Sequence, residues 1–289
     1  MAKIEDILNT KELAALPSVT TKVLDLLEDE DADTNEIVKI IKADPSLTFK
    51  VIRIANSPIY ASRMQIETID QAVMMIGFKK LTNIILGLSI FSKFWMSTKK
   101  DAKELMYKFW WHSSSTGTIA KSISSRINQD FKENEFIGGL LHQIGKLAMI
   151  QYDISMYKKV IDMIENTESS DIEAENVLYG FNHLEVGHEI SNKWKLPEEL
   201  KVIISSYPYP AQNSEFKDLV ASVNFAGLIS ERNGADFYAG LKNIDLSETE
   251  SWIVLSESYK ELKEIGIENI ISDINGELQK ASDFMNSLK

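Results

Sequence analysis

Apolar residues recur along almost the whole chain with the period of an α-helix. The clearest stripe covers residues 105–123 and consists of Leu105, Phe109, His112, Thr116, Ile119 and Ile123. Residues at this spacing share one face of a helix, so His112 is predicted to point inward. Asp44 stands directly before Pro45 and marks another helix start. Since no segment has the pattern of a hairpin, we predict an all-α protein.

Later in the chain, the same spacing predicts helices at residues 134–150, 182–194, 197–206 and 216–231, followed by two closing helices. The first of these carries His142, with Gly138 and Gly145 on either side of it. Gly187 stands in the same way one turn after His183. Glycines beside a histidine either leave open space or let another backbone approach closely. The sequence allows both explanations.

The composition fits a packed protein without disulfides. With 289 residues, 44% of them hydrophobic, the chain can form one large or two ordinary domains. The absence of cysteine excludes a disulfide framework, a thiolate nucleophile and a cysteine-based metal site. Apolar stretches reach only about 12 residues, as at 81–92, whereas a spanning helix needs roughly 20. The N-terminus carries acids where a signal peptide would be apolar, so we expect a cytoplasmic protein with no membrane association.

The formal net charge of −12 limits the partners that the chain can bind. An acidic surface repels phosphate backbones, and no base-stacking motif is present, so we expect no nucleic-acid partner. Residues 245–289 contain ten acidic residues and four lysines, and residues 28–33 form another acidic run. Such runs are usually a solvated surface, although they also suit docking of a basic partner.

The chain has four histidines, and each can be weighed separately. His188 follows His183 by five residues, so the two point in different directions and the HxxxH spacing of a helical zinc site is absent. His112, His142 and His183 fall on three different predicted helices, either as hydrogen-bonded core residues or as a cluster. As a cluster, three neutral nitrogens could hold one metal ion weakly. A two-metal hydrolase would also need carboxylates, and none is adjacent to the three in the sequence.

Several motifs resemble those of known families. HQIGK (residues 142–146) is similar to the HD-x-GK signature of the HD phosphohydrolase superfamily, and FWWHS (109–113) to the helix that gives its first histidine. Residues 182–210 resemble the part of the HD-GYP branch where an H-x-x-x-G step is followed by a His-His pair. The N-terminal part of the chain resembles the HDOD domain, whose hallmarks are more specific. They are the LP pair, the I-x-x-DP-x-L step, the ANS turn and the IDQAVMMIG helix. That resemblance runs from about Leu16 to Pro210.

The resemblance to the HDOD family implies an all-α fold in which an N-terminal helical subdomain packs on an HD-like helical subdomain. We therefore expect an HDOD domain over residues 1–210, divided at about residue 100, and a C-terminal helical extension over residues 211–289. It also implies a bacterial protein with a role in signal transduction or regulation. HDOD proteins are commonly regarded as HD relatives that have lost the metal site.

The resemblance assigns seven positions of the chain to the former metal site. The two early histidines of the superfamily fall on His112 and His142, and the histidine of the H-x-x-x-G step falls on His183. The remaining ligand positions fall on Gln143 for the signature aspartate, Tyr207 and Pro208 for the His-His pair, and Asn224 for the last aspartate. Amides bring no charge to offset a divalent cation, so we expect no catalytic residue, metal or cofactor.

Two functions remain for comparison. The first is a non-catalytic interaction module that binds an unidentified protein partner of a signalling pathway, or a small molecule in the degenerate pocket. The second is a residual metal-dependent phosphohydrolase that uses His112, His142 and His183. In an active relative Lys146 would meet substrate phosphate, but here we expect a solvated lysine.

Overall fold

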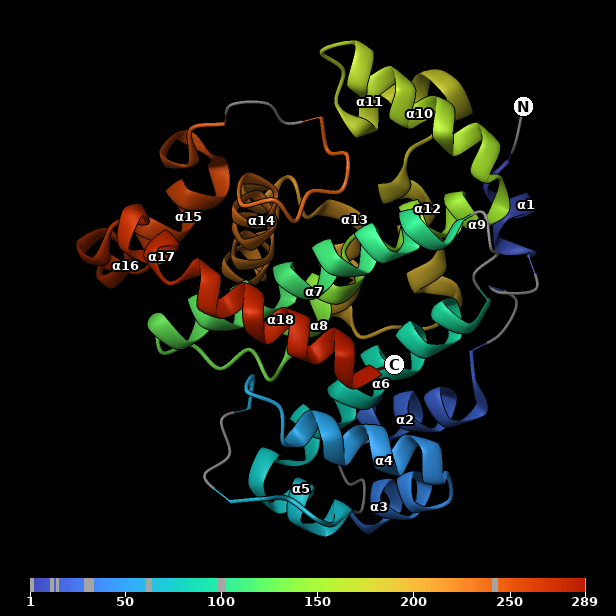
Figure 1. Ribbon diagram of the computed structural model, residues 1–289, viewed down its shortest axis with the longest axis vertical. Helices are drawn as coiled ribbons and strands as arrows, with labels where there is room; N and C mark the ends of the chain where they lie inside the picture. Colours follow the sequence, from blue (N-terminus) through green and yellow to red (C-terminus); the bar gives the residue numbers. More distant parts are fainter. Residues whose placement is uncertain are drawn as a thin grey trace.

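The computed structural model describes residues 3–10, 13, 16–28, 34–60, 64–97, 102–240 and 244–288. Every regular element in these ranges is a helix, and they contain no strand, so the all-α prediction is confirmed. Figure 1 shows two helical parts joined by α6 (Phe78–Ser97).

The smaller part contains α3, α4 and α5, which lie together at one end of the molecule in Figure 1, next to α2. Asp44 begins α4 as predicted, and its carboxylate accepts the backbone N–H groups of Ser46 at 2.9 Å and Leu47 at 3.1 Å. The short helix α1 lies elsewhere, against α9 and α12. The helices up to α6 have these bounds: α1 (Ile4–Leu8), α2 (Ser18–Glu28), α3 (Thr34–Lys42), α4 (Pro45–Ala55), α5 (Ile69–Ile76) and α6 (Phe78–Ser97).

The larger part is built around α7, which crosses the centre of the molecule in Figure 1 and packs against α8, α14 and α18. Its inward face is buried, including Phe109, Trp110 and His112. The helices have these bounds: α7 (Lys103–Arg126), α8 (Asn134–Leu141), α9 (Ile144–Tyr152), α10 (Ile154–Asn166), α11 (Asp171–Tyr179), α12 (His183–Lys193), α13 (Glu198–Ser206), α14 (Lys217–Arg232), α15 (Glu250–Ser258), α16 (Lys260–Ile265), α17 (Ile267–Ser272) and α18 (Ile274–Leu288).

Polar and ionic contacts join the two parts. Glu133, between α7 and α8, forms an ion pair with Lys121 of α7 and accepts the hydroxyl of Tyr60 at 3.0 Å. Arg53 of α4 donates to the backbone oxygen of Asn286 in α18 at 2.9 Å. The last helix therefore contacts both α7 and the smaller part, as Figure 1 also shows.

The prediction of one helix over residues 134–150 is wrong, because α8 ends at Leu141 and α9 begins at Ile144. His142 and Gln143 lie at the break. Added to Gly145, a Cβ would lie only 1.9 Å from the backbone oxygen of His183, so α9 touches α12 backbone to backbone. The nearest heavy atom to a Cβ at Gly138 would be Cδ1 of Ile203, at 2.5 Å. Of the two explanations for the glycines, close packing is correct.

The prediction of two closing helices is wrong. Four α-helices, not two, close the chain after residue 249, and Thr249 caps the first of them by accepting the N–H of Trp252 at 3.3 Å. Among the described residues, no single helix has both the length and the apolarity to cross a membrane, whereas the pair α5 and α6, bent by 116°, meets that test of length and composition together.

Candidate functional site

Six of the seven positions singled out in the sequence line one cavity of about 210 Å³ in the larger part. The cavity lies between α7, the break between α8 and α9, the start of α11, the end of α13, and α14. Its lining consists of His112, His142, Gln143, Ser170, Asp171, Ile172, Tyr207, Pro208, Tyr209, Asn224, Gly227, Leu228, Glu231 and Ala239. His183, the seventh position, is fully buried and bonds to Tyr207, one of these lining residues.

His112 and His142 lie with their Nε2 atoms 3.3 Å apart. The Nδ1 of His112 lies 2.7 Å from the backbone oxygen of Ala235, and that of His142 lies 2.8 Å from the backbone oxygen of Gly139. A carbonyl oxygen only accepts, so both Nδ1 atoms carry the proton and both Nε2 atoms keep a lone pair. Two lone pairs thus face each other at the wall of the cavity.

Burial keeps both imidazoles neutral. Burial is the largest influence on the pKa of His112 and lowers it to about 4. Burial also lowers the pKa of His142 well below its usual value, and the neighbouring His112 adds to this. Near neutral pH, neither ring supplies a proton for the space between the two Nε2 atoms.

Tyr207 joins His183 to Gln143. The Nδ1 of His183 donates to the Glu175 carboxylate at 2.7 Å, so its Nε2 accepts the Tyr207 hydroxyl at 3.1 Å. The Tyr207 oxygen in turn accepts the amide N–H of Gln143 at 3.2 Å. The ring of Tyr207 also packs edge-on against His142, with centroids 4.7 Å apart. The lone pair of His183 is therefore already used.

Sequence reasoning missed Glu175, which anchors this chain of hydrogen bonds. Its side chain is fully buried, and it accepts the backbone N–H of His183 at 2.8 Å and the hydroxyl of Tyr157 at 2.9 Å. One signal was available, since Asp171, Ala174, Glu175 and Leu178 stand at i, i+3, i+4 and i+7 on α11. Two acids on the apolar stripe of a helix indicate buried partners.

The expectation of a solvated Lys146 is wrong. Its side chain is fully buried, with Nζ 2.6 Å from the Asp171 carboxylate and 3.2 Å from the backbone oxygen of Phe237. Although burial acts to raise it, the pKa of Asp171 is lowered by the charge of Lys146. The lysine therefore neutralises a buried carboxylate at the cavity wall and does not extend toward a ligand.

Helix α14 contributes to the wall of the cavity. Asn224 and Glu231 of this helix line the cavity, and Gly227 lies between them, where an added Cβ would be 4.0 Å from Nε2 of His142. Burial raises the pKa of Glu231 to about 7; Lys146 acts in the opposite direction. A carboxyl group that changes charge near neutral pH therefore lines the cavity, and no sequence pattern singled it out.

The residues present do not fit a two-metal HD centre. His112 and His142 are placed as two neighbouring ligands, but Tyr207 occupies the lone pair of His183 and Lys146 pairs with Asp171. Across the described ranges, no three or more His, Asp or Glu side chains are arranged to hold a metal ion. Gln143 and Asn224 bring no charge to two of the positions that the resemblance assigns to anionic ligands, so these positions cannot bridge two cations.

The sequence profile of the HDOD domain family matches residues 13–208. The chain belongs to the HDOD domain family. The resemblance seen in the sequence is thereby confirmed, and the HDOD region holds six of the seven positions singled out in the sequence, all but Asn224. Helix α14, which follows the matched region, contributes Asn224 and Glu231 to the same cavity.

Solved structures share the fold. An HDOD domain protein of unknown function from Geobacter sulfurreducens has a TM-score of 0.74 and 24% identity, over 91% of this chain and 92% of its own. A protein from Shewanella amazonensis with a provisional phosphohydrolase name has a TM-score of 0.73 and 20% identity, over 98% of both chains. One from Marinobacter aquaeolei with a provisional signal-transduction name has a TM-score of 0.69 and 20% identity, over 100% of this chain and 61% of its own.

An uncharacterized protein of Treponema pallidum is 23% identical over 219 residues, which is 75% of this chain and 42% of that protein. The chain thus spans less than half of this curated relative. All these identities are below 25%, so the likenesses show the shared fold.

Proposed function

We propose that this HDOD protein is a non-catalytic interaction module of bacterial signal transduction, whose degenerate HD pocket binds a ligand or stabilises a partner-binding shape. One observation carries the proposal. Tyr207, at a position that the resemblance assigns to a metal ligand, donates its hydroxyl to the Nε2 lone pair of His183. A neutral phenol in this place leaves His183 without a free lone pair for a metal ion.

The charges at the pocket support the same proposal. Lys146, the lysine of the HD-like signature, is neutralised by Asp171 and is fully buried. Gln143 replaces the signature aspartate and donates to Tyr207. An amide at the signature position cannot bridge a metal pair, which the activation of water in a two-metal site requires.

An activity assay with metal analysis tests the proposal. Purified protein is supplied with Mn²⁺, and its metal content and turnover of a cyclic dinucleotide and of bis(p-nitrophenyl) phosphate are measured. We expect no stoichiometric metal and no turnover. Turnover that His142→Ala abolishes would overturn the proposal. An affinity pull-down from the native host, with and without Tyr207→Ala, would identify the protein partner.

The alternative is a residual metal-dependent phosphohydrolase that uses His112, His142 and His183. One observation favours it, because Nε2 atoms 3.3 Å apart suit two neighbouring ligands of one metal ion. It also requires Tyr207 to release His183. Turnover in Tyr207→Phe but not in the wild-type protein would identify the hydroxyl as the block and support a lost hydrolase.

A further inference from the structure

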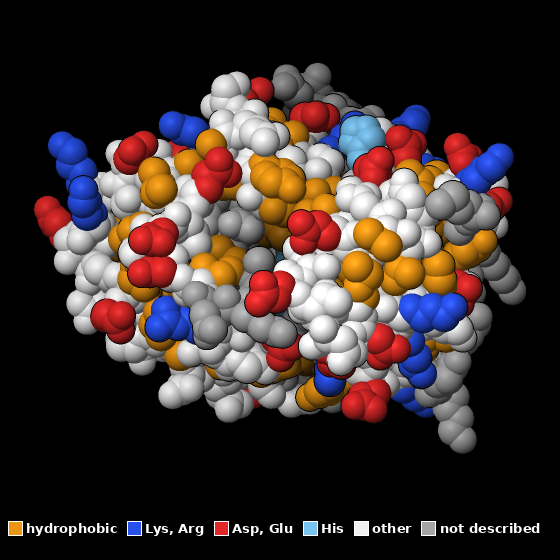
Figure 2. All heavy atoms as spheres, turned by 90° about the horizontal axis from the view of Figure 1, so that it is seen from above, with side chains coloured by type: hydrophobic (Ala, Val, Ile, Leu, Met, Phe, Trp, Pro, Cys, Tyr) orange, Lys and Arg blue, Asp and Glu red, His pale blue; other side chains and the backbone are white. Residues whose placement is uncertain are grey.

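A larger groove of about 830 Å³ adjoins the cavity. Leu228, Glu231 and Ala239 line both hollows. Figure 2 views the molecule from above and shows a face that is hollowed near its centre, with acidic side chains around the hollow. A volume of this size falls within the range of small-molecule sites, roughly 300–1,000 Å³.

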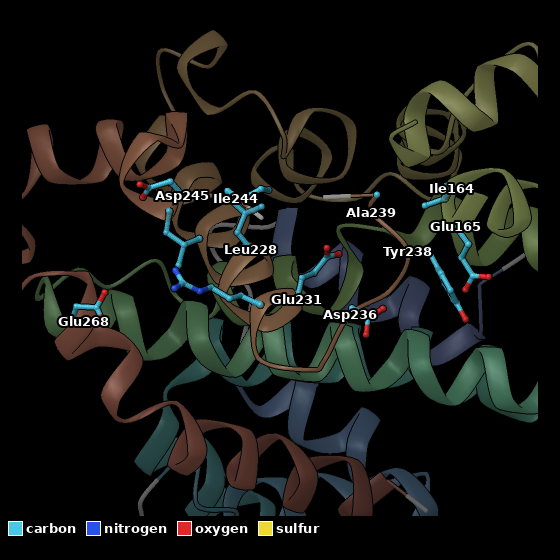
Figure 3. A pocket seen from close by; sticks show the side chains of 13 residues that line it. Ile164, Glu165, Leu228, Glu231, Asp236, Tyr238, Ala239, Ile244, Asp245 and Glu268 are labelled. Carbon is cyan, nitrogen blue, oxygen red and sulfur yellow. The ribbon is translucent and has the colours of Figure 1, made fainter. Parts of the chain in front are cut away.

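The groove is strongly acidic. Its described lining includes the carboxylates of Glu165, Glu231, Asp236, Asp245 and Glu268, and its basic side chain is Arg232. These acids come from α10, α14, α17 and the loops beside them, as Figure 3 shows. In the described part of the chain, none of the five carboxylates forms an ion pair. Such a lining attracts cations and repels phosphate esters.

The inner cavity adds a second, independent observation. The Oε1 atom of Gln143 is buried and has no hydrogen-bond partner among the described residues, while its Nε2 is used by Tyr207. The Nε2 atoms of His112 and His142 also present lone pairs, since their Nδ1 protons go to backbone oxygens. These three atoms are all acceptors, and a group with several N–H donors and a positive charge complements them.

We propose that the groove and the inner cavity together bind a linear aliphatic di- or polyamine, with one ammonium group placed between Glu231 and the acceptors of the cavity. The remaining ammonium groups lie along the carboxylates of the groove. This inference rests on the proposed function, because a pocket that performed metal hydrolysis would fill the same acceptors with metal ions. Glu231 connects the two halves of the site, since it lines both hollows.

Isothermal titration calorimetry with spermidine and putrescine, in a buffer that contains EDTA, tests the proposal. We expect spermidine to bind more tightly than putrescine, and added NaCl to weaken both. Glu231→Gln keeps the shape of the side chain and removes the charge that the carboxyl carries above about pH 7. In a buffer at pH 8 we therefore expect the affinity for spermidine to fall at least about fivefold. Glu36→Gln is the matched control, because this exposed carboxylate belongs to α3 at the other end of the molecule in Figure 1.

Asp245→Asn provides a second variant if Glu231→Gln does not fold. Asp245 is exposed, and its Oδ1 accepts the N–H of Ser247 at 2.9 Å, a bond that asparagine retains. A several-fold loss in Asp245→Asn with no loss in Glu36→Gln supports the site. Equal losses in both variants would show unspecific attraction to an acidic protein and overturn it, as would no heat of binding.

Parallel measurements separate this inference from the proposed function. Titration of Zn²⁺ or Mn²⁺ without EDTA examines whether metal ions take the acceptors instead. Tight metal binding that spermidine does not displace would overturn the amine site. Absence of spermidine binding together with absence of phosphodiester turnover would overturn only this inference, whereas turnover lost in His142→Ala would overturn the proposed function.

Discussion

The hydroxyl of Tyr207 lies 3.1 Å from Nε2 of His183 and closes a chain of buried hydrogen bonds. The chain continues to Gln143 on one side and through His183 to Glu175 on the other. Tyr207 thus holds together the break between α8 and α9, the start of α12 and the end of α13. The position that the sequence resemblance assigns to a metal ligand serves here as a structural connection.

Tyr207→Phe should lower the free energy of unfolding by about 2 kcal/mol, because two buried polar groups lose their partner. Urea denaturation followed by circular dichroism measures the change. Tyr179→Phe is a matched control, since the hydroxyl of Tyr179 is 3.5 Å from its acceptor, the backbone oxygen of Asp153. Its loss should change stability by less than about 1 kcal/mol. Equal effects of the two variants would contradict the structural role of Tyr207.

Lys146→Met should destabilise the protein by about 3–5 kcal/mol, because it leaves the buried carboxylate of Asp171 without its counter-charge. The double variant Lys146→Met/Asp171→Leu should recover much of this loss, since replacement of a whole buried ion pair by apolar residues is often neutral. A double-mutant cycle in urea gives the coupling energy. Additive losses would show that the two side chains do not interact in solution.

The sequence predicted best those features that depend on a single helix. The inward direction of His112 follows from the spacing of α7, and the start of α4 follows from Asp44. The break at His142 and Gln143 could not be predicted in the same way, because residues 136–150 are buried on every side and their apolar pattern continues across it. The contact that accompanies the break is a tertiary one, between Gly145 and the backbone of His183.

Hydrogen-bond and ion-pair partners that are distant in the sequence could not be predicted either. Nothing near Lys146 in the sequence marks Asp171 as its counter-charge, and Ala235 binds His112 from the loop after α14. The HDOD resemblance located His183 and Tyr207 but gave no reason for them to bond. Glu175 was detectable, because an acid on an apolar stripe needs a buried partner.

Gly145→Ala should lower the free energy of unfolding by at least about 3 kcal/mol, because the new Cβ cannot fit beside a backbone oxygen 1.9 Å away. Gly276→Ala in α18 is the matched control. An added Cβ there meets nothing within 4 Å, so alanine should stabilise the helix by about 0.5–1 kcal/mol. Thermal unfolding of the two variants should shift in opposite directions. A small effect of Gly145→Ala would show that α9 and α12 can separate without loss.

Glu135 should make stability fall as pH rises toward 8. This side chain is only 4% exposed, and burial, followed by the charge of Glu133, raises its pKa from 4.5 to about 7. The folded protein therefore holds a proton that the unfolded chain releases above about pH 4.5. Its contribution to stability is fully present below that pH and is lost as pH rises through about 7.

Glu135→Gln should remove this part of the pH dependence, because glutamine stays neutral at every pH. Relative to the wild-type protein, the variant should gain stability between pH 5 and 8, by at most about 3 kcal/mol. Urea denaturation at pH 5, 6, 7 and 8 measures the difference. Glu257→Gln, an exposed carboxylate of α15, should run parallel to the wild-type protein over the same range. If the Glu135→Gln curve is parallel as well, the buried carboxyl does not titrate near neutral pH.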